Sequence, residues 1–222
     1  MIVASQKPID EIVTSLGTCK KIALAACGTC VTVCLSGGES EALKLKELLL
    51  MRTAQSGNPA EITVFTPKRQ CDREFIEEIE EQIKTYECVL SLACGAGVQF
   101  MSDIFPEKQV LPAQNTSFLG VSTATGEWDE RCQGCGNCML ERTGGICPIA
   151  RCSKSNQNGP CGGSQNGKCE VDEKIECGWQ LIYDRLKAQN KVSKLTETVA
   201  PRDWRTARDG GPRKLKNEEI LI

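Results

Sequence analysis

Histidine is absent from the 222-residue sequence. The chain therefore contains no Ser–His or Cys–His catalytic pair, no imidazole general base and no mixed Cys/His zinc site. An excess of positive charge is missing as well. The sequence has 27 Lys and Arg residues and 29 Asp and Glu residues, which gives a net charge of −2. A general nucleic-acid-binding protein needs a surplus of positive charge, so that class is disfavoured and no nucleic-acid partner is expected.

Long apolar runs are also missing. No stretch approaches the roughly 18 apolar residues of a membrane-spanning helix. The first eight residues, MIVASQKP, lack the apolar core of a secretory signal. We therefore expect a cytoplasmic protein with no membrane partner, although 40 % hydrophobic residues suffice for a buried core.

Cysteine, in contrast, occurs 15 times. An odd number of cysteines cannot all form disulfides within one chain. In a cytosolic protein, so many cysteines indicate metal binding more often than cross-linking.

The first half of the chain has the pattern of an α/β fold. Helical spacing of apolar residues predicts helices over residues 9–16, after Gly37 and Gly38, over 75–83 and over 98–105. Short apolar runs predict strands at residues 22–26, 62–65, 89–93 and 109–113. Repeated βα units imply a parallel sheet with right-handed crossovers. We predict a small three-layer α/β domain over residues 1–115.

The composition changes after a predicted linker at residues 116–131. Residues 132–177 contain eight cysteines, many glycines and few large apolar residues. Such a segment cannot build a hydrophobic core, so we expect a ferredoxin-like cluster-binding domain over residues 132–188. A helical stripe returns at residues 179–186. Residues 189–222 have no clear period and are expected to form an extended C-terminal arm.

The arm and the segment at residues 115–128 are candidate surfaces for a protein partner. The arm carries Trp204 and ends on the apolar residues 220–222. Apolar side chains are unfavourable in a purely solvated tail. A disordered terminus without a partner is the alternative.

Five cysteines lie in the connections that follow predicted strands. The carboxyl ends of parallel strands share one edge of a sheet, where ligand sites form. We therefore expect a metal site, either [4Fe–4S] or zinc, drawn from five candidates with one to spare: Cys27, Cys30, Cys34, Cys71 and Cys94. A redox dithiol or ordinary buried cysteines are the alternatives. Cys19 and Cys88 precede strands at the opposite edge and are expected to be buried as small hydrophobic residues.

The cysteine spacing in the second half begins as Cys132-x2-Cys135-x2-Cys138-x8-Cys147-Pro148. This opening resembles the bacterial ferredoxin run, but eight residues replace three before Cys-Pro, so the fourth ligand is unassigned. Eight thiols allow two [4Fe–4S] clusters, and the remaining four candidates are Cys152, Cys161, Cys169 and Cys177. Zinc is the alternative, although a third cysteine at this spacing favours a cubane cluster.

No catalytic residue is predicted. Many carboxylates fall on helical faces expected to be solvated, as at Glu77 and Glu81. The Gly95-Ala-Gly97 turn matches a dinucleotide fingerprint only in part, and close packing around Cys94 explains it better. We expect a chain that binds cofactors rather than substrate.

Several motifs together resemble the methylenetetrahydrofolate reductase C-terminal domain family. In the second half they are CGNCML, GGICPIARC, NGPCGG, GKCEV and CGWQLIY. In the first half they are CGTC followed by a third cysteine, LACGAG and PAQNT. The resemblance covers roughly residues 8–205.

The resemblance implies the small iron–sulfur subunit of an acetogen-type reductase complex in Wood–Ljungdahl one-carbon metabolism. Such a subunit passes electrons to the flavin of a catalytic partner, which reduces 5,10-methylenetetrahydrofolate to 5-methyltetrahydrofolate. The flavin is expected on the partner only, because this chain is shorter than a typical TIM barrel of ~250 residues. Ferredoxin, a reduced nicotinamide and a larger electron-transfer complex all remain open as donors. The alternatives are a zinc scaffold in the same reductase and an iron–sulfur subunit of another flavoprotein, such as a heterodisulfide-reductase-like complex.

Overall fold

The computed structural model describes residues 1–217. The chain divides into two compact units, with unit 1 spanning Met1–Asp129 and unit 2 beginning at Glu130. Within the described residues, no helix combines the length and the apolar character needed to cross a membrane.

Unit 1 contains the predicted parallel sheet. Its strands are β2 (Lys21–Ala25), β3 (Glu61–Phe65), β4 (Cys88–Ser91) and β5 (Gln109–Pro112), in the order β3-β2-β4-β5. All four strand predictions are confirmed. The chain leaves β2 toward β3 and then returns to the other side of β2 to form β4. This reversal creates a topological switch point between β2 and β4, where open α/β sheets bind ligands.

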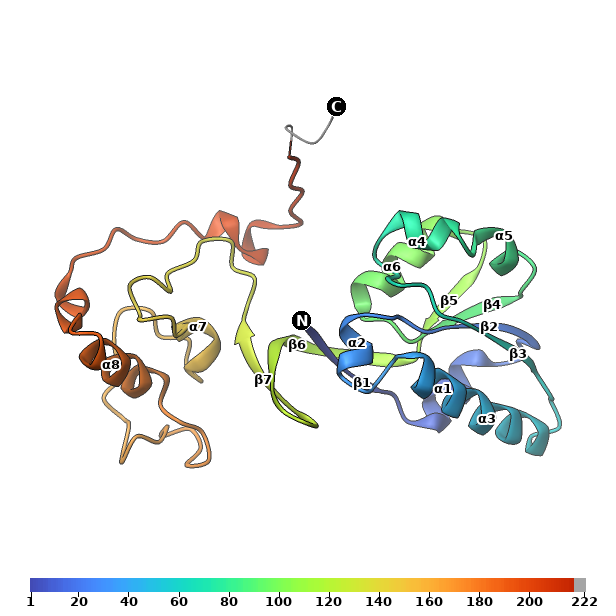
Figure 1. The fold of residues 1–222 in the computed structure, drawn as a ribbon, viewed down its shortest axis with the longest axis horizontal. Helices are drawn as coiled ribbons and strands as arrows, with labels where there is room; N and C mark the ends of the chain where they lie inside the picture. The colour runs from blue at the N-terminus through green and yellow to red at the C-terminus, as the bar shows by residue number, and fades with distance from the viewer. Residues whose placement is uncertain (218–222) are drawn as a thin grey trace. The chain divides into compact units, whose positions relative to one another are not determined.

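Helices cover both faces of this sheet (Figure 1). Helices α1 (Ile9–Leu16) and α3 (Glu39–Gln55) pack on one face, where Ile22 and Leu24 of β2 point. Helices α4 (Arg73–Glu77), α5 (Glu80–Ile83) and α6 (Gly95–Ile104) pack on the other, against Ala23 and Ala25. The alternation of β2 side chains between two cores confirms the three-layer α/β architecture.

A second, antiparallel sheet was not predicted. It contains β1 (Ile2–Gln6), β6 (Gln114–Ala124) and β7 (Glu127–Cys132), in the order β1-β6-β7. Strands β6 and β7 occupy the segment assigned to a linker, and a tight turn at Thr125 and Gly126 separates them. Gly126 has a φ of +81°, which suits the turn of a hairpin.

The short helix α2 (Cys30–Val33) lies between β2 and α3 in the chain. It contacts β1, and the thiol of Cys34 just after it donates a hydrogen bond to the carbonyl of Ile2, at 3.3 Å. The antiparallel sheet therefore lies beside the carboxyl edge of the parallel sheet.

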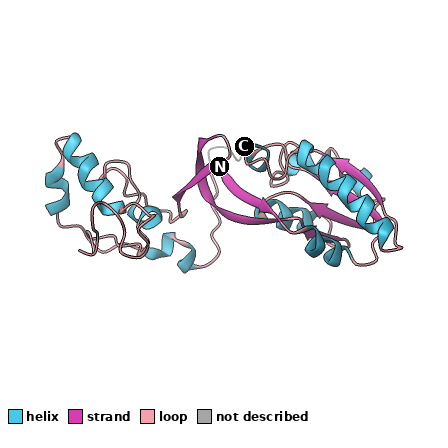
Figure 2. Cartoon of the chain, turned by 90° about the horizontal axis from the view of Figure 1, so that it is seen from below, coloured by secondary structure: helices cyan, strands magenta, loops and turns pink. Residues whose placement is uncertain are grey.

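Unit 2 has little regular structure, and loops predominate in it (Figure 2). Its helices are α7 (Pro148–Arg151), α8 (Gly178–Ala188) and the 3₁₀ turns η1 (Val192–Thr196), η2 (Trp204–Thr206) and η3 (Arg208–Gly210). The predicted stripe on α8 forms a small core of Trp179, Ile182 and Leu186. So small a core agrees with the expectation that the unit needs other means of stabilisation. A ferredoxin-like fold stays a prediction, and residues 220–222 lie outside the described part.

Candidate metal centres

The five cysteines predicted at the sheet edge lie after the carboxyl ends of strands. Cys27 and Cys94 follow β2 and β4, the two strands that flank the switch point, and Cys71 follows β3. Cys94 also occupies the N-cap position of α6. The remaining two members, Cys30 and Cys34, begin and end the turn of α2. We call these five residues the edge thiols.

Gln70 positions Cys71 among them. Its side chain is fully buried. The amide nitrogen Nε2 donates to the carbonyl oxygens of Ala25 and Ala26, both at 2.8 Å, and Oε1 accepts from the Ser91 hydroxyl at 2.6 Å. These bonds tie the loop after β3 to the ends of β2 and β4. Sequence reasoning missed Gln70, since a single glutamine in a loop carries no periodic signal.

The Cys71 thiol is influenced by two other edge thiols. Burial raises the pKa of the Cys71 thiol, and the neighbouring Cys94 and Cys27 thiols raise it further. A thiol that is disfavoured as a thiolate by neighbouring thiols becomes a favourable metal ligand once a cation neutralises the charge of the group. We call Cys27, Cys71 and Cys94, which follow β2, β3 and β4, the inner group of the edge.

Cys30 and Cys34 form a neighbouring pair. Burial raises the pKa of the Cys34 thiol, the backbone of Ala4 opposes this rise, and the Cys30 thiol adds to it. Cys34 is held against β1 by its hydrogen bond to the carbonyl of Ile2. Cys30 and Cys34 therefore belong to the turn of α2, apart from the inner group that follows the strands.

Gly97 has a packing role beside Cys94. A Cβ atom at this position would lie 2.7 Å from the Cβ of Ala93 and 3.0 Å from that of Gln70. The backbone N–H of Gly95 donates to the Thr116 hydroxyl at 2.8 Å. These contacts favour the packing explanation of the glycine turn over a phosphate cradle.

Cys19 and Cys88 form a disulfide, which the sequence analysis did not predict. Cys88 is the first residue of β4 and pairs in register with Ile22 of β2, three residues after Cys19. The bond therefore crosses the amino edge of the sheet, and these two residues are not simply buried small side chains. Their place at the edge opposite the edge thiols is confirmed.

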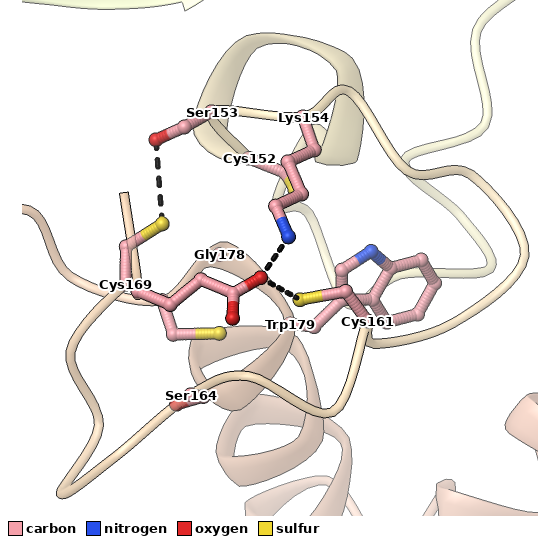
Figure 3. Close-up of a pocket in the computed structure, with 10 residues that line it drawn as sticks. Cys152, Ser153, Lys154, Cys161, Ser164, Cys169, Gly178 and Trp179 are labelled. Atoms are coloured by element: carbon pink, nitrogen blue, oxygen red, sulfur yellow. Dashed lines mark hydrogen bonds and ion pairs between the residues drawn. The ribbon is translucent and has the colours of Figure 1, made fainter. Parts of the chain in front are cut away.

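Four cysteines of unit 2 line one small pocket (Figure 3). They are Cys152, Cys161, Cys169 and Cys177, and Ser153, Lys154 and Glu170 share the lining. The free volume of the pocket is about 20 Å³. We call this group the four-thiol pocket.

Helix ends build one side of the four-thiol pocket. Cys152 is the C-cap of α7 and Cys177 is the N-cap of α8. A Cβ atom at Gly178 would lie 2.6 Å from the carbonyl oxygen of Arg151. Only glycine allows this approach, which brings the end of α7 and the start of α8 together and with them Cys152 and Cys177.

Polar contacts orient the other two thiols. Cys161 donates to Oε1 of Glu170 at 3.6 Å, and Lys154 forms an ion pair with the same oxygen. A hydrogen bond with the Ser153 hydroxyl lowers the pKa of the Cys169 thiol, and backbone groups of Val171 and Asp172 lower it further. These hydrogen bonds favour the thiolate of Cys169, the form in which cysteine binds metals.

The ferredoxin-like run lies in an exposed loop. Cys132 ends β7, and its sulfur accepts a hydrogen bond from the N–H of Gly134 at 3.3 Å. The N–H of Gly163 points in the same way at the sulfur of Cys161, at 3.5 Å. Backbone N–H groups directed at sulfur stabilise cluster-bound thiolates, so both loops suit that chemistry.

Within residues 1–217, no three Cys, Asp or Glu side chains stand at the spacing of ligands to one metal ion. The thiols of the pocket are nevertheless brought together, and all its cysteines are free. Four free thiols around one pocket, with N–H and hydroxyl donors beside them, are the type of donor set that a [4Fe–4S] cluster or a four-cysteine zinc site uses.

Comparison with known proteins gives one family match. Residues 111–205 match the family model described as methylene-tetrahydrofolate reductase C terminal. The match is less than half of the chain, but it spans all eight cysteines of unit 2. No curated protein matches the chain. No solved structure matches it either. The chain is thus similar to this family over β6, β7 and most of unit 2.

Proposed function

We propose that this chain is an iron–sulfur electron-transfer subunit that delivers electrons to the flavin of a methylenetetrahydrofolate reductase. The placement of four free cysteines around one pocket carries the proposal: Cys152, Cys161, Cys169 and Cys177. The family match over residues 111–205 supports the reductase context.

The four-thiol pocket would hold one [4Fe–4S] cluster. Its cysteines supply four thiolates, as a cubane cluster requires. Binding would replace the hydrogen bond between Cys161 and Glu170, because a thiolate has no proton to donate. Lys154 would keep positive charge beside the anionic cluster.

A second cluster would use the four remaining cysteines of unit 2. Cys132, Cys135 and Cys138 supply three, and Cys147 is the fourth by elimination. Backbone hydrogen bonds fold the intervening segment into turns, such as the bond from the N–H of Gly145 to the carbonyl of Leu140 at 2.8 Å. In a two-cluster ferredoxin, the cysteine before proline binds the other cluster. Here the four-thiol pocket already has four cysteines, so Cys147 is left for the cluster of Cys132, Cys135 and Cys138.

The clusters would supply one-electron transfer, and the residues of this chain would hold and shield them. The edge thiols would provide a third metal site, either [4Fe–4S] or zinc. Within this proposal, the reductase partner carries both the flavin and the folate.

Metal analysis separates this proposal from a zinc scaffold. Protein purified without oxygen should contain about eight iron and eight acid-labile sulfide per chain from the two clusters of unit 2. It should absorb broadly in the visible range and bleach on reduction. A colourless protein that carries zinc and no labile sulfide would establish the scaffold instead.

A further inference from the structure

The described part of the C-terminal arm contacts the loop that carries Cys135. The Thr206 hydroxyl donates to the carbonyl oxygen of Cys135 at 3.0 Å, and Nη2 of Arg202 donates to the same oxygen at 3.3 Å. Nη1 of Arg213 donates to the carbonyl oxygens of Gly134 and Thr206, both at 2.7 Å. Three residues of the arm thus hold two consecutive carbonyl groups of the loop.

Gly136 fits this contact closely. It has a φ of +77°, and a Cβ atom there would lie 2.2 Å from the carbonyl oxygen of Thr206. Any other residue would be strained by the dihedral angle and would push the arm away. The second glycine of the ferredoxin-like run is therefore matched to the arm of the same chain.

Arg202 has an unused donor at this place. Its Nε atom is buried and has no hydrogen-bond partner among the described residues. The guanidinium donates through Nη2 to the carbonyl oxygen of Cys135. It also packs on the ring of Trp204, with 4.9 Å between Cζ and the ring centroid. A buried N–H group without a partner is costly, and its presence beside a cysteine loop calls for an acceptor.

We propose that residues 202–213 are a clamp for the cluster of Cys132, Cys135 and Cys138, and that Arg202 donates its Nε–H to a thiolate sulfur of that cluster. This inference rests on the proposed function. Arg202 is then a positioning residue that also sets the reduction potential. A hydrogen bond and a positive charge stabilise the reduced, more negative cluster, so they raise its potential.

The test compares two arginines of the same arm. Arg202→Gln should shift the midpoint potential of one cluster to a lower value in an EPR-monitored redox titration of the full-length protein. Arg205→Gln is the matched control, because Arg205 pairs with Asp203 and its side chain is 88 % exposed. That control should leave every midpoint potential unchanged. Equal potentials in Arg202→Gln and in the unmodified protein would overturn the role of Arg202.

The clamp itself can be tested by hydrogen exchange. Thr206→Val removes one donor to the carbonyl oxygen of Cys135 and should increase amide hydrogen exchange over residues 132–138 in the full-length protein purified without oxygen. Arg205→Gln again serves as the control. Unchanged exchange in Thr206→Val would show that the arm does not hold the loop. Absence of any cluster from the unmodified protein would instead defeat the proposed function, and with it the role of Arg202, whatever the exchange result.

Discussion

Cys135→Ser and Cys161→Ser should each remove one [4Fe–4S] cluster, and the two changes together should remove both. The reason is that the structure assigns Cys161 to the four-thiol pocket, whereas Cys135 lies in the ferredoxin-like loop. Each single variant should lose about four iron and four sulfide per chain, since loss of one thiolate exposes the whole cubane. Iron and sulfide analysis of anaerobically purified variants measures this.

Pairs of changes within one set provide the control. Cys161→Ser combined with Cys169→Ser should cost no more iron than either change alone, because both residues hold the same cluster. Cys147→Ser should behave in the same way when combined with Cys135→Ser. If the iron losses of two changes in the same proposed cluster added up, the assignment of the eight cysteines to two clusters would be refuted. A full iron content in Cys135→Ser would refute the assignment of Cys135 as a ligand.

Loss of a cluster should also unfold its surroundings. Unit 2 buries few large side chains, chiefly Trp179, Ile182 and Leu186 of α8. If unit 2 holds the proposed clusters, we expect the free energy of cluster binding to supply much of its folding free energy. Limited proteolysis of Cys135→Ser should cut between residues 132 and 147 faster than in the unmodified protein.

The two edges of the parallel sheet should respond in opposite ways to loss of a cysteine. Cys94→Ala should lower the content of the third metal, because Cys94 follows β4 at the switch point beside Cys27 and Cys71. Cys88→Ala should leave the metal content unchanged. It should lower the free energy of unfolding of the oxidised protein by about 2–5 kcal/mol, because the lost disulfide closes a long loop.

Denaturant titrations and metal analysis of both variants test this contrast. The sequence separation of 69 residues between Cys19 and Cys88 makes the cross-link a strong constraint on the unfolded chain. Cys19→Ala should match Cys88→Ala, since both remove the same bond, and a reductant should shrink the difference for both. Equal metal loss in all three variants would contradict the separation of the two edges.

The central part of the fold could be predicted from the sequence because its signals are local. Strands β2, β3 and β4 are short apolar runs, and α1, α3 and α8 show apolar residues at helical spacing. The stripe over residues 75–83 is also real, but two short helices replace one, and Ile79 lies between them with a φ of −116°. Apolar periodicity shows which face is buried but not where the backbone breaks.

The antiparallel sheet could not be found in the same way. Most residues of β6 are exposed or half-buried, so the strand shows no apolar run. Its partner β1 lies more than a hundred residues earlier in the chain, and long-range pairing leaves no local pattern. The Thr125-Gly126 pair is a local turn signal between β6 and β7.

The candidate sites follow the same division. The sequence predicts that Cys27, Cys71 and Cys94 share one sheet edge, because each follows the carboxyl end of a parallel strand. The Cys19–Cys88 disulfide depends on the neighbouring positions of β2 and β4, which spacing does not reveal. Likewise, the arm was expected to serve a partner, and only the fold shows that Thr206 and Arg202 contact Cys135 of the same chain.

Rapid mixing with the flavin-bearing reductase tests electron delivery most directly. The protein, reduced at its clusters and freed of excess reductant, is mixed without oxygen with the oxidised catalytic subunit. Cluster absorbance should return to its oxidised form as the flavin bleaches, with two electrons leaving the clusters for each flavin fully reduced. Adding 5,10-methylenetetrahydrofolate should then reoxidise the flavin. A flavin that stays oxidised beside reduced clusters would contradict the proposed role.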